Sequence, residues 1–246
     1  MKIALIGYGK MGKLIESFAI DQGHTIELTI GSENTSDLTI DKLKKCDIAI
    51  EFSTPNSALE NILTCVNARI PLVVGTTGQW YEQLDLVKKE VEANKTALLY
   101  ATNFSIGVNI FFAINNYLAE IMKSYNNYNP EIEEIHHTQK KDSPSGTAIT
   151  IANGILSRLT NKTKWENIVL KDNEKHHFSN DTLQIKSVRK DPAPGTHIVK
   201  YISPTDTIQI CHEAFNRNGF ALGSVLAAEW LHGKKGIFTM EDIIKF

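Results

Sequence analysis

The densest group of reactive side chains in this 246-residue sequence runs from His136 to Ala148. It consists of His-His-Thr-Gln-Lys-Lys-Asp-Ser-Pro-Ser-Gly-Thr-Ala. Adjacent residues of a strand point to opposite faces of a sheet, so His136 and His137 make a poor metal chelate, and we predict no metal site. One histidine can instead face a cleft and transfer a proton, because imidazole titrates near neutral pH.

The same segment predicts an anion-binding helix end. Ser143 can cap a helix that begins at Pro144, because proline at the first helical position loses no hydrogen bond. The free backbone N–H groups would then be those of Ser145, Gly146 and Thr147. Together with the Thr147 hydroxyl and Lys140, they could hold a carboxylate. A histidine acid beside such a site suits reduction of a small polycarboxylate, whereas the alternative is a structural helix with two surface histidines.

A glycine-rich segment near the start predicts a dinucleotide site. It follows a strand-like apolar run, Lys2 to Ile6, and opens an amphipathic helix from Met11 to Asp21. In this context the three glycines allow a tight turn, close approach of a pyrophosphate, and close packing of helix on strand. The residues expected to bind a nicotinamide dinucleotide are Gly7, Tyr8, Gly9, Lys10, Met11 and Gly12. The alternative is a purely structural turn.

Two further segments extend this cofactor prediction. Glu33 lies where an acidic residue would hold the adenosine ribose, although it could be a solvated loop carboxylate. No arginine follows it, so NADH is favoured over NADPH, with Lys10 available to supply one charge to a 2′-phosphate. Gly75, Thr76 and Thr77 follow a strand-like run and could lie against the nicotinamide ribose, or form an ordinary turn.

The elements that must position these groups alternate between strand and helix up to about residue 100. That alternation predicts a Rossmann-type, doubly wound parallel sheet with helices on both faces. After Asn103 a long helix, 105–123, precedes a strand at 131–137, a helix at 144–159 and a polar loop at 160–181. Three strand-like runs follow, at 183–189, 196–202 and 207–211, and then a helix at 219–231. We therefore predict an α/β protein with a dinucleotide-binding domain, 1–104 plus 217–246, and a second α+β domain, 105–216.

Composition excludes several classes of protein. The net charge of −2 provides no global field for nucleic acid or an anionic membrane. No apolar run is long enough to span a bilayer, and Met1-Lys2 begins no signal-peptide pattern, so we predict a cytoplasmic protein. The three cysteines form no C-x-x-C pair and are expected to be buried packing residues. His176 and His177 lie in a polar loop and are expected to be solvated.

Taken together, these motifs resemble the 4-hydroxy-tetrahydrodipicolinate (dihydrodipicolinate) reductase family over nearly the whole chain. The most specific part is the string from His136 to Ala148. Further support comes from Gly75-Thr76-Thr77-Gly78, Asn103-Phe104-Ser105-Ile106-Gly107-Val108, Ser187-Val188-Arg189 and Gly195-Thr196-His197. The sequence departs from many members in having a shorter glycine loop, and Ser143 in place of alanine. The shorter loop leaves the cofactor preference open.

The resemblance implies roles for individual residues. His136 would be the general acid/base, and Lys140 a proton donor that also pairs with the dicarboxylate. His137, Gly146 and Thr147, with Ser145, would hold substrate carboxylates. The cofactor would contact the glycine loop, Glu33, Gly75 to Thr77, and the segment Ala101, Thr102, Asn103 and Phe104. The second domain would bind substrate and build a homotetramer through its sheet.

The expected reaction is transfer of a hydride from NADH or NADPH to C4 of the cyclic substrate, with loss of water and protonation by His136 or Lys140. It belongs to diaminopimelate and lysine biosynthesis. Two other interpretations remain: a dehydrogenase acting on another small carboxylate such as aspartate or homoserine, and a non-catalytic NAD(H)-sensing protein. The second would have no need for a histidine–lysine pair beside a carboxylate site.

Overall fold

The computed structural model describes residues 1–169 and 179–244, so the predicted solvation of His176 and His177 lies outside the described residues. The chain divides into two compact units. The first comprises Met1–Ile106 and Asn218–Phe246, and the second Gly107–Arg217. Within the described residues, no helix is long and apolar enough to cross a membrane.

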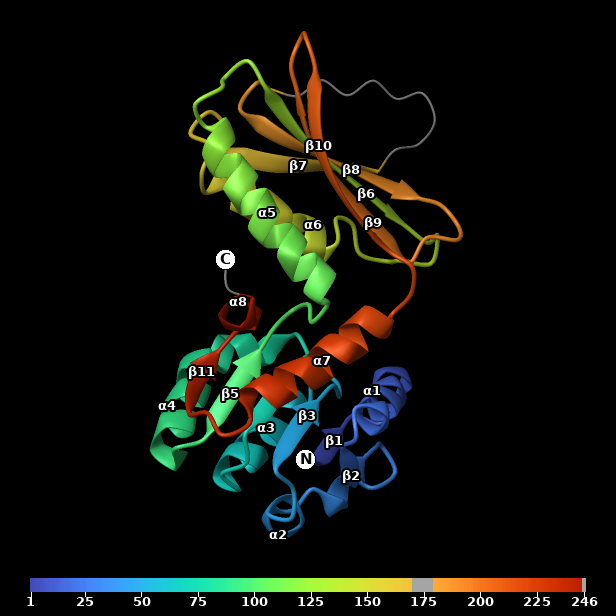
Figure 1. The fold of residues 1–246 in the computed structure, drawn as a ribbon, viewed down its shortest axis with the longest axis vertical. Coiled ribbons are helices and arrows are strands. Elements are labelled where there is room, and N and C mark those ends of the chain that lie inside the picture. Colours follow the sequence, from blue (N-terminus) through green and yellow to red (C-terminus); the bar gives the residue numbers. More distant parts are fainter. Residues whose placement is uncertain (170–178, 245–246) are drawn as a thin grey trace. The chain divides into compact units, whose positions relative to one another are not determined.

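The first unit is built on a six-stranded, wholly parallel sheet with the order β11-β5-β4-β3-β1-β2. Its strands are β1 (Lys2–Ile6), β2 (Thr25–Ile30), β3 (Ile48–Glu51), β4 (Leu72–Val74), β5 (Ala97–Tyr100) and β11 (Gly236–Phe238). The chain passes from β1 to β2 and returns to the other side of β1 to form β3 (Figure 1). The strand order therefore reverses between β1 and β3, which is where doubly wound sheets bind their ligands.

Helices cover both faces of this sheet, because its strands are apolar on both sides. The helices are α1 (Lys10–Asp21), α2 (Ile40–Leu43), α3 (Ala58–Asn67), α4 (Leu84–Asn94), α7 (Asn218–Leu231) and α8 (Met240–Ile243). Ile3 and Leu5 of β1 share a buried cluster with α1 and α7. Ala4 and Ile6 share another with α3 and α4. The alternating side chains of one strand thus enter two separate cores.

The second unit is built on a five-stranded mixed sheet with the order β10-β9-β6-β8-β7. Its strands are β6 (Asn129–His136), β7 (Lys164–Val169), β8 (Thr182–Arg189), β9 (Gly195–Ile202) and β10 (Thr207–Ala214). The central strand, β6, runs parallel to β8 and antiparallel to β9. This confirms the predicted mixed α+β architecture, and it puts the chemistry-bearing end of β6 in the middle of the sheet.

Two helices, α5 (Ile106–Met122) and α6 (Gly146–Leu156), lie on one face of that sheet (Figure 1). Phe111 and Ala119 of α5, with Ala148, Ile151 and Ile155 of α6, join the sheet's buried cluster. The core therefore fixes where α6 begins relative to the end of β6.

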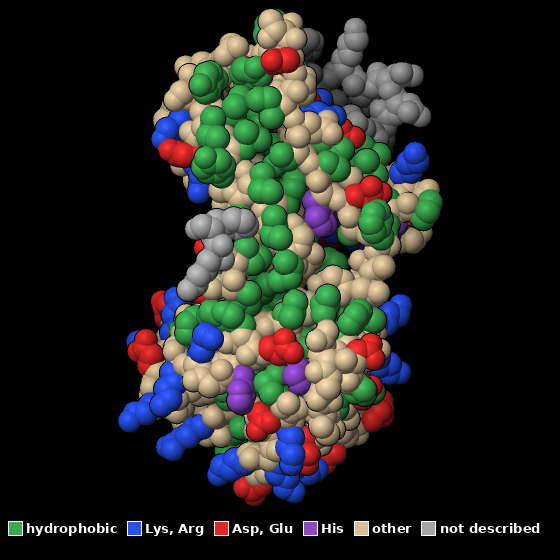
Figure 2. Space-filling view, in the orientation of Figure 1, with side chains coloured by type: hydrophobic (Ala, Val, Ile, Leu, Met, Phe, Trp, Pro, Cys, Tyr) green, Lys and Arg blue, Asp and Glu red, His purple; other side chains and the backbone are tan. Residues whose placement is uncertain are grey.

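Helix α5 is apolar around most of its circumference, but only one side of it faces the sheet. Ile110, Ile114, Tyr117 and Ile121 form a stripe on another side and are 37%, 44%, 71% and 43% exposed. Apolar side chains gather along this helix in the space-filling view (Figure 2). This side of α5 is therefore uncovered in the single chain. Cys211 is also exposed, so the predicted burial of all three cysteines is wrong for this one, whereas Cys46 and Cys65 are buried as predicted.

One element differs from the sequence prediction. The polar loop expected over 160–181 contains β7, which pairs with β8 as its one partner among the described strands. Its sequence shows no apolar alternation, because only Trp165 of this strand packs against the buried cluster. Elsewhere, a 3₁₀ turn, Gln79–Gln83, precedes α4, and α3 begins at Ala58. The three-residue strand β11 is too short to give a sequence pattern.

Candidate active site

The glycine loop of the first unit has the geometry of a dinucleotide-binding turn. Gly7 has a φ of +94°, and a β-carbon there would lie 2.2 Å from the Phe52 carbonyl oxygen. A β-carbon on Gly12 would lie 2.2 Å from the Gly7 carbonyl oxygen, so α1 packs directly on the turn. At Gly9, which precedes α1, the same position is open space. The three glycines thus provide a turn, an open approach and a packing contact, as a bound pyrophosphate requires.

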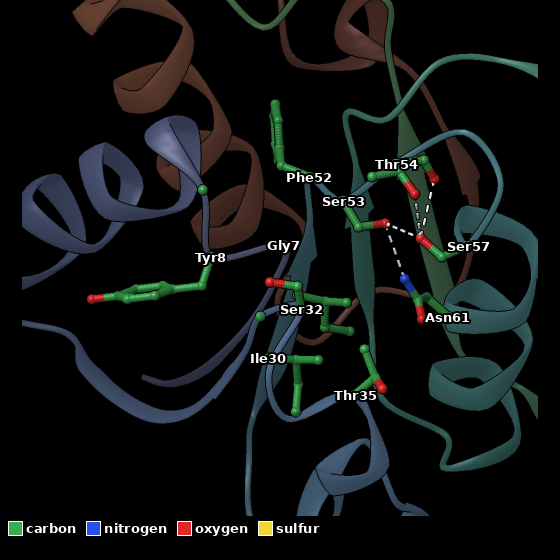
Figure 3. A pocket seen from close by; sticks show the side chains of 13 residues that line it. Gly7, Tyr8, Ile30, Ser32, Thr35, Phe52, Ser53, Thr54, Ser57 and Asn61 are labelled. Atoms are coloured by element: carbon green, nitrogen blue, oxygen red, sulfur yellow. Dashed lines mark hydrogen bonds between the residues drawn. The ribbon is translucent and has the colours of Figure 1, made fainter.

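A cavity of about 500 Å³ lies beyond the carboxyl ends of β1, β2 and β3 (Figure 3). The residues that line it are Ile6, Gly7, Tyr8, Gly9, Ile30, Gly31, Ser32, Thr35, Phe52, Ser53, Thr54, Ser57 and Asn61. None of these described lining residues is a lysine or arginine. The cavity is therefore at the predicted switch point and carries no fixed positive charge.

A network of hydroxyl and amide groups forms one wall of the cavity (Figure 3). The Ser53 hydroxyl lies 3.0 Å from the Ser57 hydroxyl and accepts a hydrogen bond of 3.0 Å from the Asn61 amide. Behind this wall, the fully buried Glu51 accepts hydrogen bonds from the Ser53 backbone N–H at 3.1 Å and from Asn61 at 3.3 Å. Burial raises the pKa of Glu51 above its usual value, although these hydrogen bonds act in the opposite direction. Sequence analysis missed this wall, because it follows β3 without a glycine motif.

Phe52 connects the cavity to the other predicted cofactor segments. A β-carbon on Gly75 would lie 2.2 Å from the Phe52 ring, and the ring centroids of Phe52 and Phe104 are 5.6 Å apart. Around these contacts, Thr76 and Asn103 are buried, Ala101 is half-buried, and Thr77 and Thr102 are exposed. The ends of β4 and β5 are therefore brought to the same edge as the glycine loop.

Of the fourteen predicted cofactor residues, Gly7, Tyr8 and Gly9 line the cavity and the other eleven do not. Among those eleven, Glu33 is exposed and accepts a hydrogen bond of 3.3 Å from Ser32. Lys10 is exposed at the first position of α1, and Met11 packs against the buried cluster beneath α1. The loop before Glu33 is held by Asn34, which accepts from the Gly31 N–H at 2.8 Å and donates to the Thr29 carbonyl at 2.9 Å.

In the second unit, the buried face of β6 carries polar as well as apolar side chains. Its buried face presents Ile132, Glu134 and His136 in turn. Ile132 lies in the apolar cluster, whereas Glu134 is 0% and His136 7% exposed. His137 is half-buried, and its backbone N–H donates to the Ala193 carbonyl at 2.9 Å. The strand alternation that argued against a His136–His137 chelate thus directs His136 inward.

The start of α6 differs from the prediction by two residues. Ser145, not Ser143, caps the helix: its hydroxyl accepts from the Ala148 N–H at 3.1 Å. The Ser145 N–H donates to Glu134 Oε2 at 3.0 Å, so it is not free. Pro144 thus lies before the helix and not at its first position. Among the described residues, no hydrogen bond uses the N–H groups of Gly146 and Thr147, and Gly146 has open space beside it.

Glu134 lies at the centre of the buried cluster. Its Oε1 accepts from the Ser187 hydroxyl at 2.7 Å and lies 3.6 Å from an Arg189 nitrogen. Its Oε2 lies 3.5 Å from His136 Nε2. Burial alone would raise the pKa of Glu134, yet the facing His136 and the hydrogen bonds from Ser145 and Ser187 outweigh it and hold the pKa well below its usual range. Glu134 is therefore ionised at neutral pH.

His197 completes the cluster from β9, where it is the direct cross-strand partner of Glu134. Its Nε2 shares a hydrogen bond of 3.1 Å with the Ser145 hydroxyl, and its ring centroid is 5.2 Å from that of His136. Burial, together with the nearby His136, lowers the pKa of His197 to about 3. His197 is thus a neutral hydrogen-bonding residue. Among the described residues, none hydrogen-bonds to His136 Nε2.

Lys140 lies on the loop between β6 and α6 and is paired locally. Its ammonium group donates to both carboxylate oxygens of Asp142 at 2.7 Å. That carboxyl has a pKa held below its usual range by the Lys140 hydrogen bond. Arg189 donates to the Asp142 carbonyl at 2.8 Å and so ties the loop to β8.

Glu134, His136 and His197 each place one possible ligand atom within 4.8 Å of the others, a spacing that could hold a metal ion. However, Glu134 Oε2 accepts the Ser145 N–H, and His197 Nε2 bonds to the Ser145 hydroxyl. We interpret the three side chains as a hydrogen-bonded cluster. The absence of a metal stays a prediction.

The comparisons with known proteins agree with both units. Residues 1–104 match the family model described as dihydrodipicolinate reductase, N-terminus, and residues 107–244 the model of its C-terminus. The chain belongs to the dihydrodipicolinate reductase family. It is 43% identical to a 4-hydroxy-tetrahydrodipicolinate reductase of Christiangramia forsetii, over 99% of this chain and 98% of the relative. It is 33% identical to that of Methanosarcina acetivorans, over 98% and 88%.

Solved structures agree on the fold. A dipicolinate-bound dihydrodipicolinate reductase from a Paenisporosarcina species superposes with a TM-score of 0.76 at 23% identity, covering 99% of this chain and all of that one. An amine dehydrogenase from Mycobacterium smegmatis superposes with a TM-score of 0.63 at 9% identity, covering 96% and 94%. Dihydrodipicolinate reductases are pyridine-nucleotide-dependent, so membership in the family makes this chain an NAD(P)H-dependent reductase.

In the second unit, sequence analysis missed Glu134 and assigned no role to His197 or Arg189. A signal for Glu134 was present: it occupies the core phase of the β6 alternation, between Ile132 and His136. A carboxylate at a buried position indicates a cluster of groups that pair with it and hydrogen-bond to it, and such clusters are often functional. His197 gave no comparable signal, because its partners come from distant parts of the sequence.

Proposed function

We propose that the protein reduces 4-hydroxy-tetrahydrodipicolinate to tetrahydrodipicolinate, using NADH or NADPH, in diaminopimelate and lysine biosynthesis. The observation that supports this most is the end of β6, where His136 has an unused Nε2 beside the free N–H groups at the start of α6. An acid next to a carboxylate site is what reduction of a cyclic dicarboxylate requires. Family membership supplies the substrate class.

The free N–H groups of Gly146 and Thr147 would hold one substrate carboxylate. They open an 11-residue helix, whose N-terminus carries partial positive charge, and Gly146 leaves room for close approach. The Thr147 and Ser145 hydroxyls and His137 would complete this binding site. Lys140 would pair with the dicarboxylate after leaving Asp142.

His136 or Lys140 would supply the proton that completes the reaction. A substrate hydroxyl leaves as water more readily when protonated. After the loss of water, hydride addition at C4 leaves negative charge on the neighbouring conjugated atoms of the ring, and protonation there completes the reduction. His136 is buried among groups that fix its ring, which suits it to proton transfer at one defined atom, Nε2. The second unit, 105–216 in our assignment, would therefore be the substrate domain.

The first unit fits the dinucleotide. Gly7, Gly9 and Gly12 provide the required cradle, and the cavity beyond β1, β2 and β3 has room for a nucleoside. When bound, the reduced nicotinamide supplies the hydride. Since no lysine or arginine is among the cavity's described lining residues, we propose NADH as the preferred donor. Residues 1–104 with 217–246 would form this cofactor domain, with Tyr8, Lys10, Met11, Glu33, Gly75 to Thr77 and Ala101 to Phe104 at or near the ligand.

We further propose a cytoplasmic homotetramer, assembled through the sheet of the second unit. The expectation comes from the family likeness. Light scattering on purified protein would test it, with an expected mass of four times the 27.5 kDa chain. A monomer or dimer at micromolar concentration contradicts it.

Steady-state kinetics with both cofactors and freshly prepared 4-hydroxy-tetrahydrodipicolinate test the proposed reaction. We expect oxidation of NADH and NADPH that depends on this substrate, with the higher kcat/KM for NADH. Aspartate and homoserine, offered with NAD⁺ or NADP⁺, serve as controls for the related dehydrogenases. Failure to consume the cyclic substrate, or faster turnover of a control, would overturn the assignment.

Two variants test the residue roles within that assay. His136→Gln should lower kcat by roughly 10²–10⁴-fold with little change in KM, as for a lost general acid. Lys140→Ala should raise KM for the dicarboxylate and also lower kcat. An unchanged kcat in His136→Gln removes this residue from the chemistry.

A further inference from the structure

The buried carboxylate of Glu134 has no role in the scheme above, yet it contacts both parts of the substrate site. We propose that Glu134 is a positioning residue, whose single carboxylate fixes the His136 ring and the α6 terminus relative to one another. The inference rests on the proposed function. It identifies Glu134 as the residue that sets the position of the acid, His136, relative to the proposed carboxylate-binding site at the start of α6.

The carboxylate is held rigidly from three elements. The Ser187 hydroxyl and Arg189 approach Oε1 from β8, at 2.7 and 3.6 Å. The Ser145 N–H approaches Oε2 from the start of α6, at 3.0 Å. Glu134 itself lies on β6, two residues before His136, so both side chains point to the same face. A side chain with this many fixed partners has little conformational freedom. Its carboxylate therefore also restrains the positions of the groups that contact it.

The first consequence concerns substrate binding. By taking the Ser145 N–H, Glu134 leaves the next two N–H groups, on Gly146 and Thr147, to receive an anion. The bond also fixes the first turn of α6 against β6. The substrate carboxylate is thereby placed at a defined distance from the His136 ring.

The second consequence concerns the ring of His136. Oε2 of Glu134 lies 3.5 Å from His136 Nε2, so the carboxylate faces the nitrogen that is proposed to transfer the proton. Because the carboxylate is itself fixed by Ser187 and Ser145, this contact defines the position of that side of the ring.

Packing alone gives no reason for a carboxylate here. The neighbouring buried positions of the same sheet hold Ile132, Val199 and Ile185, and an apolar residue at 134 would continue that core. A buried charge is costly unless it is fully paired, and an apolar replacement of similar size is often at least as stable. The retained charge is consistent with a role in positioning.

Glu134→Gln tests the inference, because glutamine keeps the shape and removes the charge. Glu120→Gln, which removes an exposed carboxylate on α5 paired with Lys123, is the matched control. We expect Glu134→Gln to lower kcat by about 10²-fold, as misplacement of a reacting group does, with a much smaller change in KM. Glu120→Gln should match the wild type in both kcat and KM.

Two further variants keep the test decisive if glutamine disturbs folding. Glu134→Asp retains a carboxylate that can accept from Ser145 and Ser187, so it should keep a higher kcat per folded molecule than Glu134→Gln. Ser187→Ala removes one support of the carboxylate and should lower kcat less than Glu134→Gln does. A purely structural role predicts instead that kcat losses follow the loss of folded protein and that KM changes along with kcat. That outcome, or wild-type kinetics in Glu134→Gln, overturns the inference.

A measurement without substrate separates this inference from the proposed reaction. In protein labelled with ¹⁵N-histidine, the ring nitrogen signals of His136 should shift and broaden in Glu134→Gln relative to the wild type, because the ring loses the carboxylate that faces it. If the wild type lacks reductase activity but these signals change, the proposed function fails and the positioning role of Glu134 stands. If the enzyme is active and the signals do not change, the inference fails alone.

Discussion

Gly195 lies against the imidazole of His136: a β-carbon built on the glycine would be 3.1 Å from Cε1 and 3.3 Å from Nδ1 of the ring. Gly195 begins β9 and His136 ends β6, so two antiparallel neighbours meet at this point. Glu134 lies near the Nε2 side of the same ring at 3.5 Å. The ring is therefore confined between a backbone that has no side chain and a buried carboxylate.

Gly195→Ala should displace this ring by a few tenths of an ångström or more, since contacts below 3.4 Å leave no space for a methyl group. We expect kcat to fall by at least about tenfold, because catalysis depends steeply on the position of the reacting group. KM for the cyclic substrate should change little, as Gly146 and Thr147 are untouched. Steady-state kinetics and far-UV circular dichroism check this. A folded variant with the wild-type kcat would show that the ring tolerates the methyl group.

Much of the first unit could be predicted from the sequence, because each of its elements carries a local signal. The strand from Lys2, the three glycines and the helix after them specify one another over about twenty residues. The cavity wall that includes Ser53 and Asn61 could not be predicted in this way. Those side chains become neighbours through a turn after β3, and serine and asparagine occur in many loops without binding anything.

In the second unit the sequence identified the important segment but not its contacts. Strand alternation predicted that one of the two histidines can face a cleft, and the structure shows that His136 is the buried one. The cap on α6 was misassigned, since both Ser143 and Ser145 precede helix-compatible residues, and only the tertiary bond from the Ser145 N–H to Glu134 separates them. His197 lies about 60 residues from His136 in the chain, and only the pairing of β6 with β9 brings them together.

Gly9 and Gly12 should respond differently to alanine. A β-carbon on Gly12 would collide with the Gly7 carbonyl at 2.2 Å, so Gly12→Ala should destabilise the fold by about 1–3 kcal/mol, as overpacking does. A methyl group on Gly9 meets nothing within 4 Å and should leave the melting temperature unchanged. It should raise KM for NADH, by about tenfold or ~1.4 kcal/mol, by obstructing the pyrophosphate.

Thermal melts and cofactor titrations of both variants separate the two effects. The assignment of Gly9 as the open approach is contradicted if Gly9→Ala binds NADH as the wild type does. The packing role of Gly12 is contradicted if Gly12→Ala melts at the wild-type temperature.

Asp142 holds the Lys140 ammonium through two bonds of 2.7 Å, and a substrate carboxylate must compete with it. Asp142→Asn should therefore lower KM for the dicarboxylate by about 1.4–5-fold, the range expected when an exposed ion pair of 0.2–1 kcal/mol is removed. The backbone bond from Arg189 to residue 142 does not depend on the carboxylate and should hold the loop in place. The KM at low ionic strength is the measurement. A higher KM would mean that Asp142 orients Lys140 for the substrate instead of competing for it.

His197 should make the fold sensitive to mild acid. Its pKa is lowered to about 3 in the folded protein by burial and by the nearby His136, from an ordinary value of 6.5. Between those values the unfolded chain binds the proton and the folded protein does not, so the free energy of unfolding falls as the pH falls, by at most about 1.4 kcal/mol per pH unit.

His197→Gln can still bond to the Ser145 hydroxyl but cannot titrate. Its urea midpoint should therefore drop less than that of the wild type between pH 7.5 and 5, whereas the exposed control His232→Gln should follow the wild type. Equal drops in all three proteins would mean that His197 takes up its proton in the folded state at ordinary pH, and that the buried cluster accommodates the charge.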